Sequence, residues 1–276
     1  MRGRKVKASI LRLSLLSVVA LTACTTIPRE PDAPSEFIKL TLIQDGELPA
    51  PSSCVVKKRI AYTICMDTKT HLALWVAYRL TKAGVTSEAN QRKNNWRTDP
   101  DFPWLTSKVY SKSGFDKGHL APAEDFESSL QAMNESFYYS NSAPQVETFN
   151  RGIWQKAEKA ARELALTHES ALIASGPVIE RGLPPFRDAA VVPRRFWKAV
   201  LVVSNSNGVI SSPTPAVPRL HANAWIIPTD AKSKDLAPYT VSVDEVERVT
   251  GLDLFSAYEN QLEEQFESHS SGIVLN

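Results

Sequence analysis

Continuous and alternating apolar runs predict that much of this chain forms a β-sheet. Residues 72–80 read Leu-Ala-Leu-Trp-Val-Ala-Tyr-Arg-Leu, with apolar side chains at nearly every position. A strand buried on both faces carries such a run, so we predict an interior strand here, next to a strand at residues 60–66. Four further strands are predicted at residues 171–175, 196–203, 222–227 and 239–243.

Helices are predicted between and after these strands, at residues 130–137, 151–166 and 243–250. The last begins with a capping box, in which Ser242 precedes Glu245 by three residues, and ends at Gly251. A closing helix is expected near residues 258–268. Because strands and helices mix without regular alternation, the pattern favours the α+β class over a doubly wound sheet.

The N-terminus has the pattern of a bacterial lipoprotein signal. Basic residues precede an apolar run at residues 13–23, which is too short to cross a bilayer because a spanning helix needs roughly 20 apolar residues. Leu-Thr-Ala-Cys24 resembles a lipobox, which predicts cleavage before Cys24 and lipidation of its thiol. An ordinary secretory signal with a chance cysteine is the alternative. Thr25, rather than Asp, follows, which favours the outer membrane of a two-membrane cell.

This signal divides the chain into three predicted parts. Residues 1–23 are the signal peptide, residues 24–50 the lipidated cysteine and a flexible tether, and residues 51–276 one domain. The signal holds five of the 32 basic residues and no acidic one, so cleavage leaves 27 against 30, a net charge of about −3. Global charge therefore does not indicate nucleic-acid binding, and any site for a polyanion must be a local patch.

Two cysteines remain once Cys24 is assigned to lipid. Cys54 and Cys65 form an even pair in an oxidising compartment, which favours a disulfide. A bond across so short a loop would stabilise the fold by about 2–3 kcal/mol. Two buried free thiols are the alternative.

The segment Ser-Gly-Phe-Asp-Lys-Gly-His-Leu-Ala-Pro, residues 113–122, carries a candidate general base. Gly118 permits a turn or a close backbone approach beside His119, whose imidazole suits proton transfer at neutral pH. Beside this histidine, the carboxylate of Asp116 can orient or hydrogen-bond a neighbouring group, and the ammonium of Lys117 can contact phosphate. A lone histidine is more often a structural residue, so this segment alone leaves both interpretations open.

A second segment, residues 141–158, carries a candidate metal ligand. Asn150 is predicted at the start of a helix, with Trp154 and Glu158 one and two turns later on the same face. A carboxamide oxygen is a hard ligand suited to Mg²⁺, and Glu158 is then placed to hold metal-bound waters. The structural alternative is that Asn150 only caps the helix.

Together, Asp-Lys-Gly-His-Leu-Ala-Pro, Asn-x-x-Pro-Gln and Asn-Arg-Gly-x-Trp-x-x-x-Glu resemble the DNA/RNA non-specific endonuclease family, which includes mitochondrial endonuclease G. Other similar elements are Trp-Val-Ala-Tyr78, Asn-Trp-x-Thr-Asp-Pro100 and Ser-Gly-Pro177, so the resemblance extends over residues 59–267. It implies the ββα-metal fold, an α+β architecture with a central, mostly antiparallel sheet flanked by helices.

The resemblance also implies roles for individual residues. His119 corresponds to the general base that activates water, and Asn150 to the single direct protein ligand of Mg²⁺. Glu158 corresponds to the acidic residue that orients metal-bound water, and Asn141 to a polar residue that supports the metal and the phosphate.

The phosphate contacts depart from the family pattern. Lys117 stands where many members have arginine, and lysine lacks the bidentate fork of the guanidinium. Arg92 best matches the family arginine at the scissile phosphate, with Arg97 as the fallback. The local basic patch would draw on Arg92, Lys93, Arg97, Lys108, Lys112, Lys117, Arg151 and Lys156, although lysines such as Lys108 and Lys156 are equally consistent with a solvated surface.

The expected function is therefore that of a Mg²⁺-dependent endonuclease, with Mn²⁺ as the alternative ion. It would hydrolyse DNA, RNA or both with little sequence specificity, because contacts to phosphate carry no base information. One alternative is an envelope lipoprotein that binds nucleic acid without cutting it, and another is a phosphoesterase for small phosphodiesters. No HxH, HExxH or CxxC spacing links the other histidines into a zinc site, and no protein partner is indicated.

Overall fold

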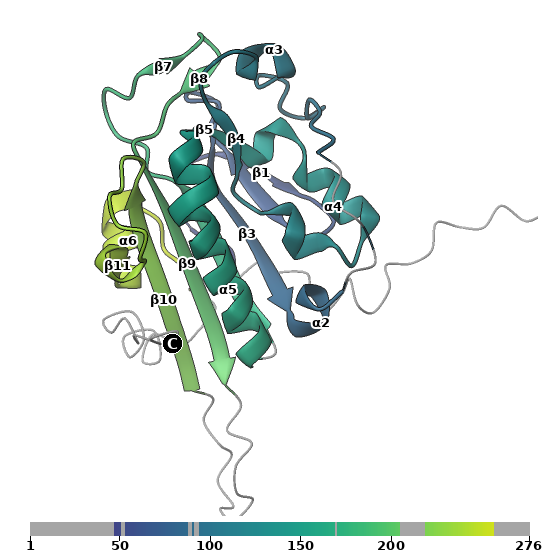
Figure 1. Ribbon diagram of the computed structural model, residues 1–276, viewed down its shortest axis with the longest axis vertical. Helices are drawn as coiled ribbons and strands as arrows, with labels where there is room; N and C mark the ends of the chain where they lie inside the picture. The colour runs from purple at the N-terminus through teal and green to yellow at the C-terminus, as the bar shows by residue number, and fades with distance from the viewer. Residues whose placement is uncertain are drawn as a thin grey trace, which may run out of the picture. The chain divides into compact units, whose positions relative to one another are not determined.

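Seven strands form one sheet in which every neighbouring pair is antiparallel (Figure 1). The computed structural model describes residues 47–50, 53–87, 90, 94–168, 170–204 and 219–256. Across the sheet the strands are β1 (Val55–Lys58), β2 (Thr63–Met66), β3 (Ala73–Thr81), β6 (Ser170–Pro177), β9 (Arg195–Ser204), β10 (Arg219–Pro228) and β11 (Thr240–Val241).

Helices cover both faces of this sheet. The helix α5 (Gln155–His168) packs alanines such as Ala157 and Ala161 against β3, β6 and β9 (Figure 1). The helix α6 (Val243–Thr250) packs Val243 and Val246 against the opposite face, at β9 and β10. The expected α+β architecture, an antiparallel sheet flanked by helices, is confirmed.

The two-sided covering explains the apolar run at residues 72–80. Along β3, Val76 belongs to the core under α5, whereas Trp75 belongs to the core on the other face. Successive side chains of a strand point to opposite faces, so a strand covered on both sides needs apolar residues at nearly every position. The prediction of an interior strand is confirmed, since β3 lies between β2 and β6.

The other predicted elements agree with the structure except at some ends. Each predicted strand corresponds to one of the sheet, although the run at residues 60–66 forms a strand only from Thr63 onward. The helix α6 has the predicted bounds: Ser242 Oγ accepts a hydrogen bond from the Glu245 amide at 3.1 Å, and Gly251 ends the helix at φ 73°. The remaining elements are α2 (Lys82–Val85), α3 (Ser107–Tyr110), α4 (Leu130–Ser136), β7 (Pro185–Phe186), β8 (Ala190–Val191) and 3₁₀ turns at Ala123–Phe126, Tyr139–Asn141 and Ala237–Tyr239.

A separate two-stranded hairpin carries the first motif. β4 (Asp116–His119) pairs antiparallel with β5 (Ser142–Gln145), so that His119 lies opposite Ser142. Of the two possibilities expected for Gly118, the structure has the close backbone approach and not the turn, because His119 ends a strand. Gly118 is needed there for close packing, since a Cβ atom at this position would lie 2.1 Å from Cδ of Gln145.

The hairpin leads into a π-helix, Phe149–Trp154, and then into α5. Gly152 leaves helical geometry inside it, with φ −112° and ψ −107°. Short π-helical segments are frequent at functional sites. Asn150 lies inside this segment, whose N-cap is Thr148, so it does not serve as the helix cap.

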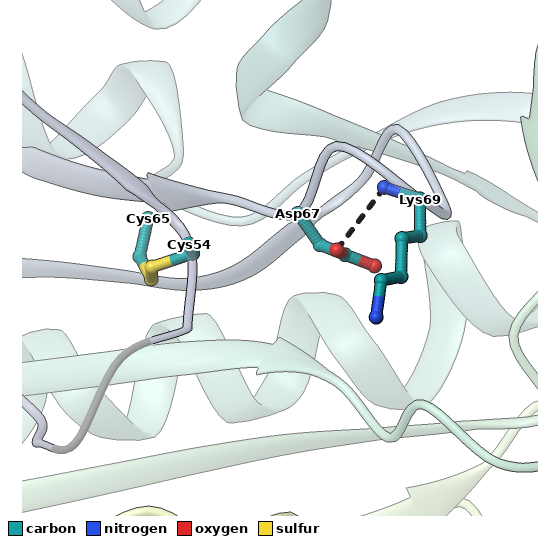
Figure 2. The surroundings of a disulfide bond; sticks show 4 residues. All are labelled: Cys54, Cys65, Asp67 and Lys69. Atoms are coloured by element: carbon teal, nitrogen blue, oxygen red, sulfur yellow. Dashed lines mark hydrogen bonds between the residues drawn. A yellow bond between two sulfur atoms is a disulfide. The ribbon is translucent and has the colours of Figure 1, made fainter.

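A disulfide joins Cys54 to Cys65, whose Cα atoms are 5.4 Å apart (Figure 2). Cys65 is buried in β2, and Cys54 directly precedes β1, so the bond fastens the edge strand to its neighbour. Beyond β2 the chain turns at Asp67, whose carboxylate accepts hydrogen bonds from the amides of Lys69 and Thr70.

Several predictions lie outside the described residues. These are the signal peptide at residues 1–23, lipidation at Cys24, most of the tether at residues 24–50 and the helix near residues 258–268. Within the described part of the chain, no helix is long and apolar enough to span a membrane. The described residues all belong to one compact unit, residues 36–276.

Candidate active site

Both motifs meet at one pocket with a volume of about 420 Å³. It lies where the end of β4, the π-helix and the first turn of α5 come together with the segment at residues 94–96. Four of the predicted site residues line it: Lys117, His119, Asn150 and Glu158. The other lining residues are Asn94, Trp96, Pro122, Glu124, Arg151 and Gln155.

His119 is held at the end of β4 by aromatic neighbours and by its own backbone. Its ring centroid is 4.5 Å from that of Trp96 and 5.2 Å from that of Phe137. The carbonyl oxygen of His119 accepts a hydrogen bond from Trp154 Nε1 at 3.0 Å, which ties the strand to the helix segment. The side chain is 7 % exposed, so its position is defined while it still faces the pocket.

The position of Trp96 is set by the segment that follows it. The backbone of Arg97 exchanges hydrogen bonds with Phe137 and Tyr139. The fully buried carboxylate of Asp99 accepts two hydrogen bonds from the Arg59 guanidinium, at 2.7 and 2.6 Å. These contacts hold the Asn-Trp-x-Thr-Asp-Pro element against the wall beside the imidazole.

Asn150 is oriented by a charged neighbour. Its Nδ2 donates a hydrogen bond to Asp116 Oδ2 at 3.0 Å, and Arg151 donates to both oxygens of the same carboxylate, at 2.9 and 3.1 Å. Within the described residues, no hydrogen bond reaches the carboxamide oxygen of Asn150. Since the amide nitrogen is engaged by Asp116, that oxygen is the atom left for a ligand.

Glu158 belongs to a buried group of charges beneath the pocket. It is 9 % exposed, and burial raises the pKa of its carboxyl to about 8, while the ammonium of Lys198 opposes this rise. Lys198 is fully buried, with Nζ 4.9 Å from the centre of the Trp154 ring, and burial lowers its pKa to about 8. Asp125 and Arg162 form a neighbouring ion pair at 2.8 Å.

The π-helix changes the expected arrangement along the helix. Asn150 and Glu158 both line the pocket, but Trp154, predicted on the same face, is fully buried. It contacts Lys198 and the His119 carbonyl instead. The irregular turn at Gly152 lies between Asn150 and Trp154, so these two residues are not separated by one regular helical turn.

Asn141 does not line the pocket. Its side chain is fully buried and bonded to the backbone: Oδ1 accepts from the Ala121 amide at 3.0 Å, and Nδ2 donates to the carbonyls of Ala121 and Ser136 at 2.8 Å. Asn141 therefore braces the chain just after His119, and both of its amide hydrogens are used within the fold.

Of the three predicted phosphate contacts, only Lys117 lines the pocket in the described part of the chain. Arg92, like Lys93, lies outside the described residues. The fallback, Arg97, does not line the pocket, because its guanidinium stacks on Tyr138, 4.9 Å from the ring centre, and donates to the Asn134 carbonyl. Lys117 does line it, with Nζ 5.9 Å from the Trp96 ring.

The pocket contains residues for which the sequence had indicated no role. Trp96, Glu124 and Gln155 line it beside the predicted residues. Trp96 belongs to one of the familial elements, which was the available signal. The position of Gln155 follows the π-helix, which the sequence pattern did not reveal. The remaining histidines of the described chain are elsewhere: His71 stacks on Trp104, and His168 lies 6.0 Å from His221.

The donor set suits a hard divalent cation. A carboxamide oxygen whose amide nitrogen is fixed by Asp116 shares the pocket with the buried carboxyl of Glu158. Mg²⁺ keeps most of its waters and needs few protein ligands, so one amide oxygen with a nearby carboxyl group to hold those waters fits this ion. Among the described residues there is no cluster of three or more His, Cys, Asp or Glu side chains that could hold a metal.

Comparisons with known proteins identify the family. The family model described as DNA/RNA non-specific endonuclease matches residues 42–261. Mitochondrial endonuclease G of Bos taurus is 30 % identical over 257 residues, which cover 87 % of this chain and 81 % of the relative. A protein named nuclease from Nostoc sp. is 31 % identical and covers 75 % of each chain.

A solved structure agrees with these relatives. The crystal structure of an EndoG/EndoGI complex superposes with a TM-score of 0.67 at 25 % identity, covering 78 % of this chain and 90 % of that one. The chain therefore belongs to the DNA/RNA non-specific endonuclease family of metal-dependent nucleases, and it is a phosphodiester hydrolase with the ββα-metal fold.

Proposed function

We propose that the protein is a Mg²⁺-dependent endonuclease that cuts DNA, RNA or both with little sequence specificity, using His119 as general base and Asn150 as metal ligand. The observation that carries this proposal is the shared pocket: an oriented carboxamide oxygen lies with a fixed imidazole and a buried carboxyl in about 420 Å³. Hydrolysis of a phosphodiester needs a base for the attacking water and relief of the charge that develops on the phosphate.

The protein's own groups meet these needs as follows. An imidazole nitrogen of His119 accepts the proton of the attacking water, a step that typically accelerates such reactions by about 10²- to 10⁴-fold. Trp96 and Phe137 fix the imidazole plane. Glu158 holds water on the metal side of the pocket, and the side chain of Asn150 would hold the ion itself. When bound, the ion would act as a Lewis acid that stabilises charge on the phosphate and on the leaving oxygen.

Cationic side chains bind the phosphate at the pocket. Lys117 and Arg151 both line it, and we propose that Arg92 completes the set. Arg151 is partly neutralised by Asp116 and Glu147, so Lys117 is the freer of the two charges in the described part of the pocket. Because Lys117 supplies a point charge where a guanidinium would bind two oxygens, its contribution depends less on the orientation of the phosphate.

The test is a digestion assay with plasmid DNA and with RNA, run with Mg²⁺, with Mn²⁺ and with EDTA. We expect cleavage of at least one polymer that EDTA abolishes and that His119→Ala reduces by about 10²-fold or more. His71→Ala, a histidine stacked on Trp104 outside the pocket, is the matched control and should keep wild-type activity. Binding without cleavage by the wild-type protein would instead indicate a nucleic-acid-binding envelope protein.

We also propose that the protein is exported and anchored to the outer membrane by lipid at Cys24. Support comes from the basic, apolar and lipobox pattern of residues 1–24. The tether would end by residue 46, because Glu47 pairs with Arg79 and the backbone of Ala50 pairs with that of Asp253, so the predicted end of the tether at residue 50 is wrong. Cys24→Ser should release the protein from the membrane fraction and shift its intact mass by the acyl groups. Unchanged membrane fractionation and mass would contradict the anchor.

A further inference from the structure

A second cavity, larger than the pocket, opens directly beside it. Its volume is about 700 Å³, and it shares Arg151 and Gln155 with the active-site pocket. One wall is residues 146–156, which include the π-helix, and the other is residues 229–234, which follow β10. The end of β10 and the start of α5 lie at the same end of the sheet (Figure 1). The cavity thus continues the pocket along one side.

The charges of the two cavities differ. The lining of the pocket has two basic residues, Lys117 and Arg151, and two acidic residues, Glu124 and Glu158. The second cavity is lined by four basic residues and one acidic residue, Asp230. We call it the flanking groove and define it by its basic residues: Arg151, Lys156, Lys232 and Lys234.

The lysines of the 229–234 wall are available to a ligand. Lys232 and Lys234 are exposed, and within the described residues neither ammonium pairs with a carboxylate. The ammonium of Lys156 donates to the backbone carbonyl of Lys234 at 2.7 Å, which joins α5 to this wall. Unpaired ammonium groups along a groove are the arrangement that binds successive phosphates of a nucleic-acid strand.

The wall itself is built by internal hydrogen bonds. The amide of Thr229 donates to the Arg194 carbonyl at 2.8 Å, and the Ser233 amide donates to the hydroxyl of Tyr239 at 3.0 Å. The backbone that carries Lys232 and Lys234 therefore has a defined path beside the pocket, so binding there does not require the wall to fold first.

We propose that the flanking groove binds the phosphates of the nucleic-acid strand next to the scissile bond. This inference rests on the proposed nuclease function, and it adds where the substrate lies: the scissile phosphate occupies the pocket, and the neighbouring phosphates contact Lys232, Lys234 and Lys156. Contacts of this kind bind the backbone without reading bases, and they favour polymers over single phosphodiesters.

The test compares two double variants in equilibrium binding. The groove variant is Lys232→Ala/Lys234→Ala. The control, Lys57→Ala/Lys69→Ala, removes the same charge from β1 and from the turn after β2, at the opposite edge of the sheet from β10. Both are made in the full chain with His119→Ala, and binding to a single-stranded oligonucleotide of about 20 nucleotides is measured by anisotropy between 50 and 200 mM salt, in roughly the range where phosphate contacts dominate.

The expected effect follows from the loss of two phosphate contacts. The slope of log K against log salt should fall in magnitude by about 1.4, because each contact to single-stranded nucleic acid contributes about 0.7. At 0.1 M salt this corresponds to binding about 25-fold weaker, and the control should bind like the parent. Equal losses in the two variants, or an unchanged slope in the groove variant, would overturn the proposal.

A second measurement separates this proposal from the proposed catalysis. With His119 intact, the groove variant should hydrolyse bis(p-nitrophenyl) phosphate, which has no neighbouring phosphate, at the wild-type rate, while its KM for the oligonucleotide rises. Loss of activity on both substrates would contradict a flanking role. If the wild-type protein cuts neither substrate, the nuclease function fails, but the binding experiment still decides whether the groove holds nucleic acid.

Discussion

The contact between Asp116 and Asn150 yields a quantitative prediction for metal binding. The carboxylate accepts a hydrogen bond from Asn150 Nδ2 at 3.0 Å, and the carboxamide oxygen of this pocket residue is left for a cation. Asp116→Ala removes this acceptor, so the carboxamide can rotate and present its NH₂ group, which cannot bind a cation. We therefore expect the variant to need more Mg²⁺ than the wild type.

The magnitude follows from the type of bond. Hydrogen bonds to charged groups contribute about 1.5–3 kcal/mol, and each 1.4 kcal/mol is tenfold in an equilibrium constant. Asp116 is 21 % exposed, which favours the lower part of that range. The concentration of Mg²⁺ for half-maximal activity should thus rise by about 10-fold, within the 10- to 100-fold range typical of residues that orient a metal ligand.

The assay is hydrolysis of one fixed substrate against Mg²⁺ concentration, with calorimetric titration of Mg²⁺ as a second readout. Asp116→Asn keeps one neutral acceptor and should fall between the wild type and Asp116→Ala. Glu147→Gln is the matched control, because Glu147 pairs with Arg151 at 2.7 Å but forms no hydrogen bond with the Asn150 side chain in the described structure. If Asp116→Ala retains wild-type metal dependence, or if Glu147→Gln shifts it equally, the orienting role is refuted.

Three further predictions concern stability and the imidazole. Cys54→Ala/Cys65→Ala should lower Tm by about 4–12 °C, because the cross-link across a separation of 11 residues contributes about 2–3 kcal/mol; an unchanged calorimetric Tm would contradict this. With metal chelated, the free energy of unfolding should fall between pH 4.5 and 8, since burial raises the pKa of Glu158 to about 8 and the folded chain keeps a proton that the unfolded chain releases. In urea titrations Glu158→Gln should reduce this slope. Lys198→Met should extend the fall to higher pH, because the ammonium that opposes the rise in the pKa of Glu158 is gone. Identical pH profiles in all three proteins would show that the carboxyl does not titrate as described. Trp96→Ala should lower kcat/KM by about 2- to 10-fold, because the imidazole of His119 loses the ring that packs against it. Trp96→Phe should retain most activity, and equal kinetics for the two variants would contradict this role of the ring.

The large elements were predictable because burial leaves a pattern in the sequence. The apolar run at residues 72–80 indicates a strand that is buried on both faces of the sheet. Ser242 and Gly251 mark the two ends of α6. The hairpin at the site was not predicted, because β4 and β5 are four-residue strands of polar and small residues. Their pairing depends on contacts far along the chain, such as the fit of Gly118 against Gln145.

The site residues were predictable to different degrees for a related reason. His119 and Asn150 were chosen because their chemistry and the surrounding motif are both visible in the sequence, and both line the pocket. The sequence does not distinguish an asparagine at a pocket from one that braces the backbone, and the side chain of Asn141 is buried and bonded to three backbone groups. The role of Lys198 was equally hidden, since its charge matters only after β9 and α5 have packed together.

The distribution of charge explains how a pocket without excess positive charge can serve a polyanion. Of the two basic side chains in the described lining, Arg151 is already paired with Asp116 and Glu147, so a phosphate gains little from the pocket's charges alone. A divalent cation at Asn150 would change that balance by two charges, and the flanking groove adds lysines that face no acidic partner of their own. In this arrangement the groove supplies attraction for the strand, while the pocket keeps its carboxyl and imidazole for the reaction. Removing the metal should therefore abolish cleavage but leave much of the salt-dependent binding, whereas removing Lys232 and Lys234 should weaken binding but leave hydrolysis of a minimal phosphodiester intact.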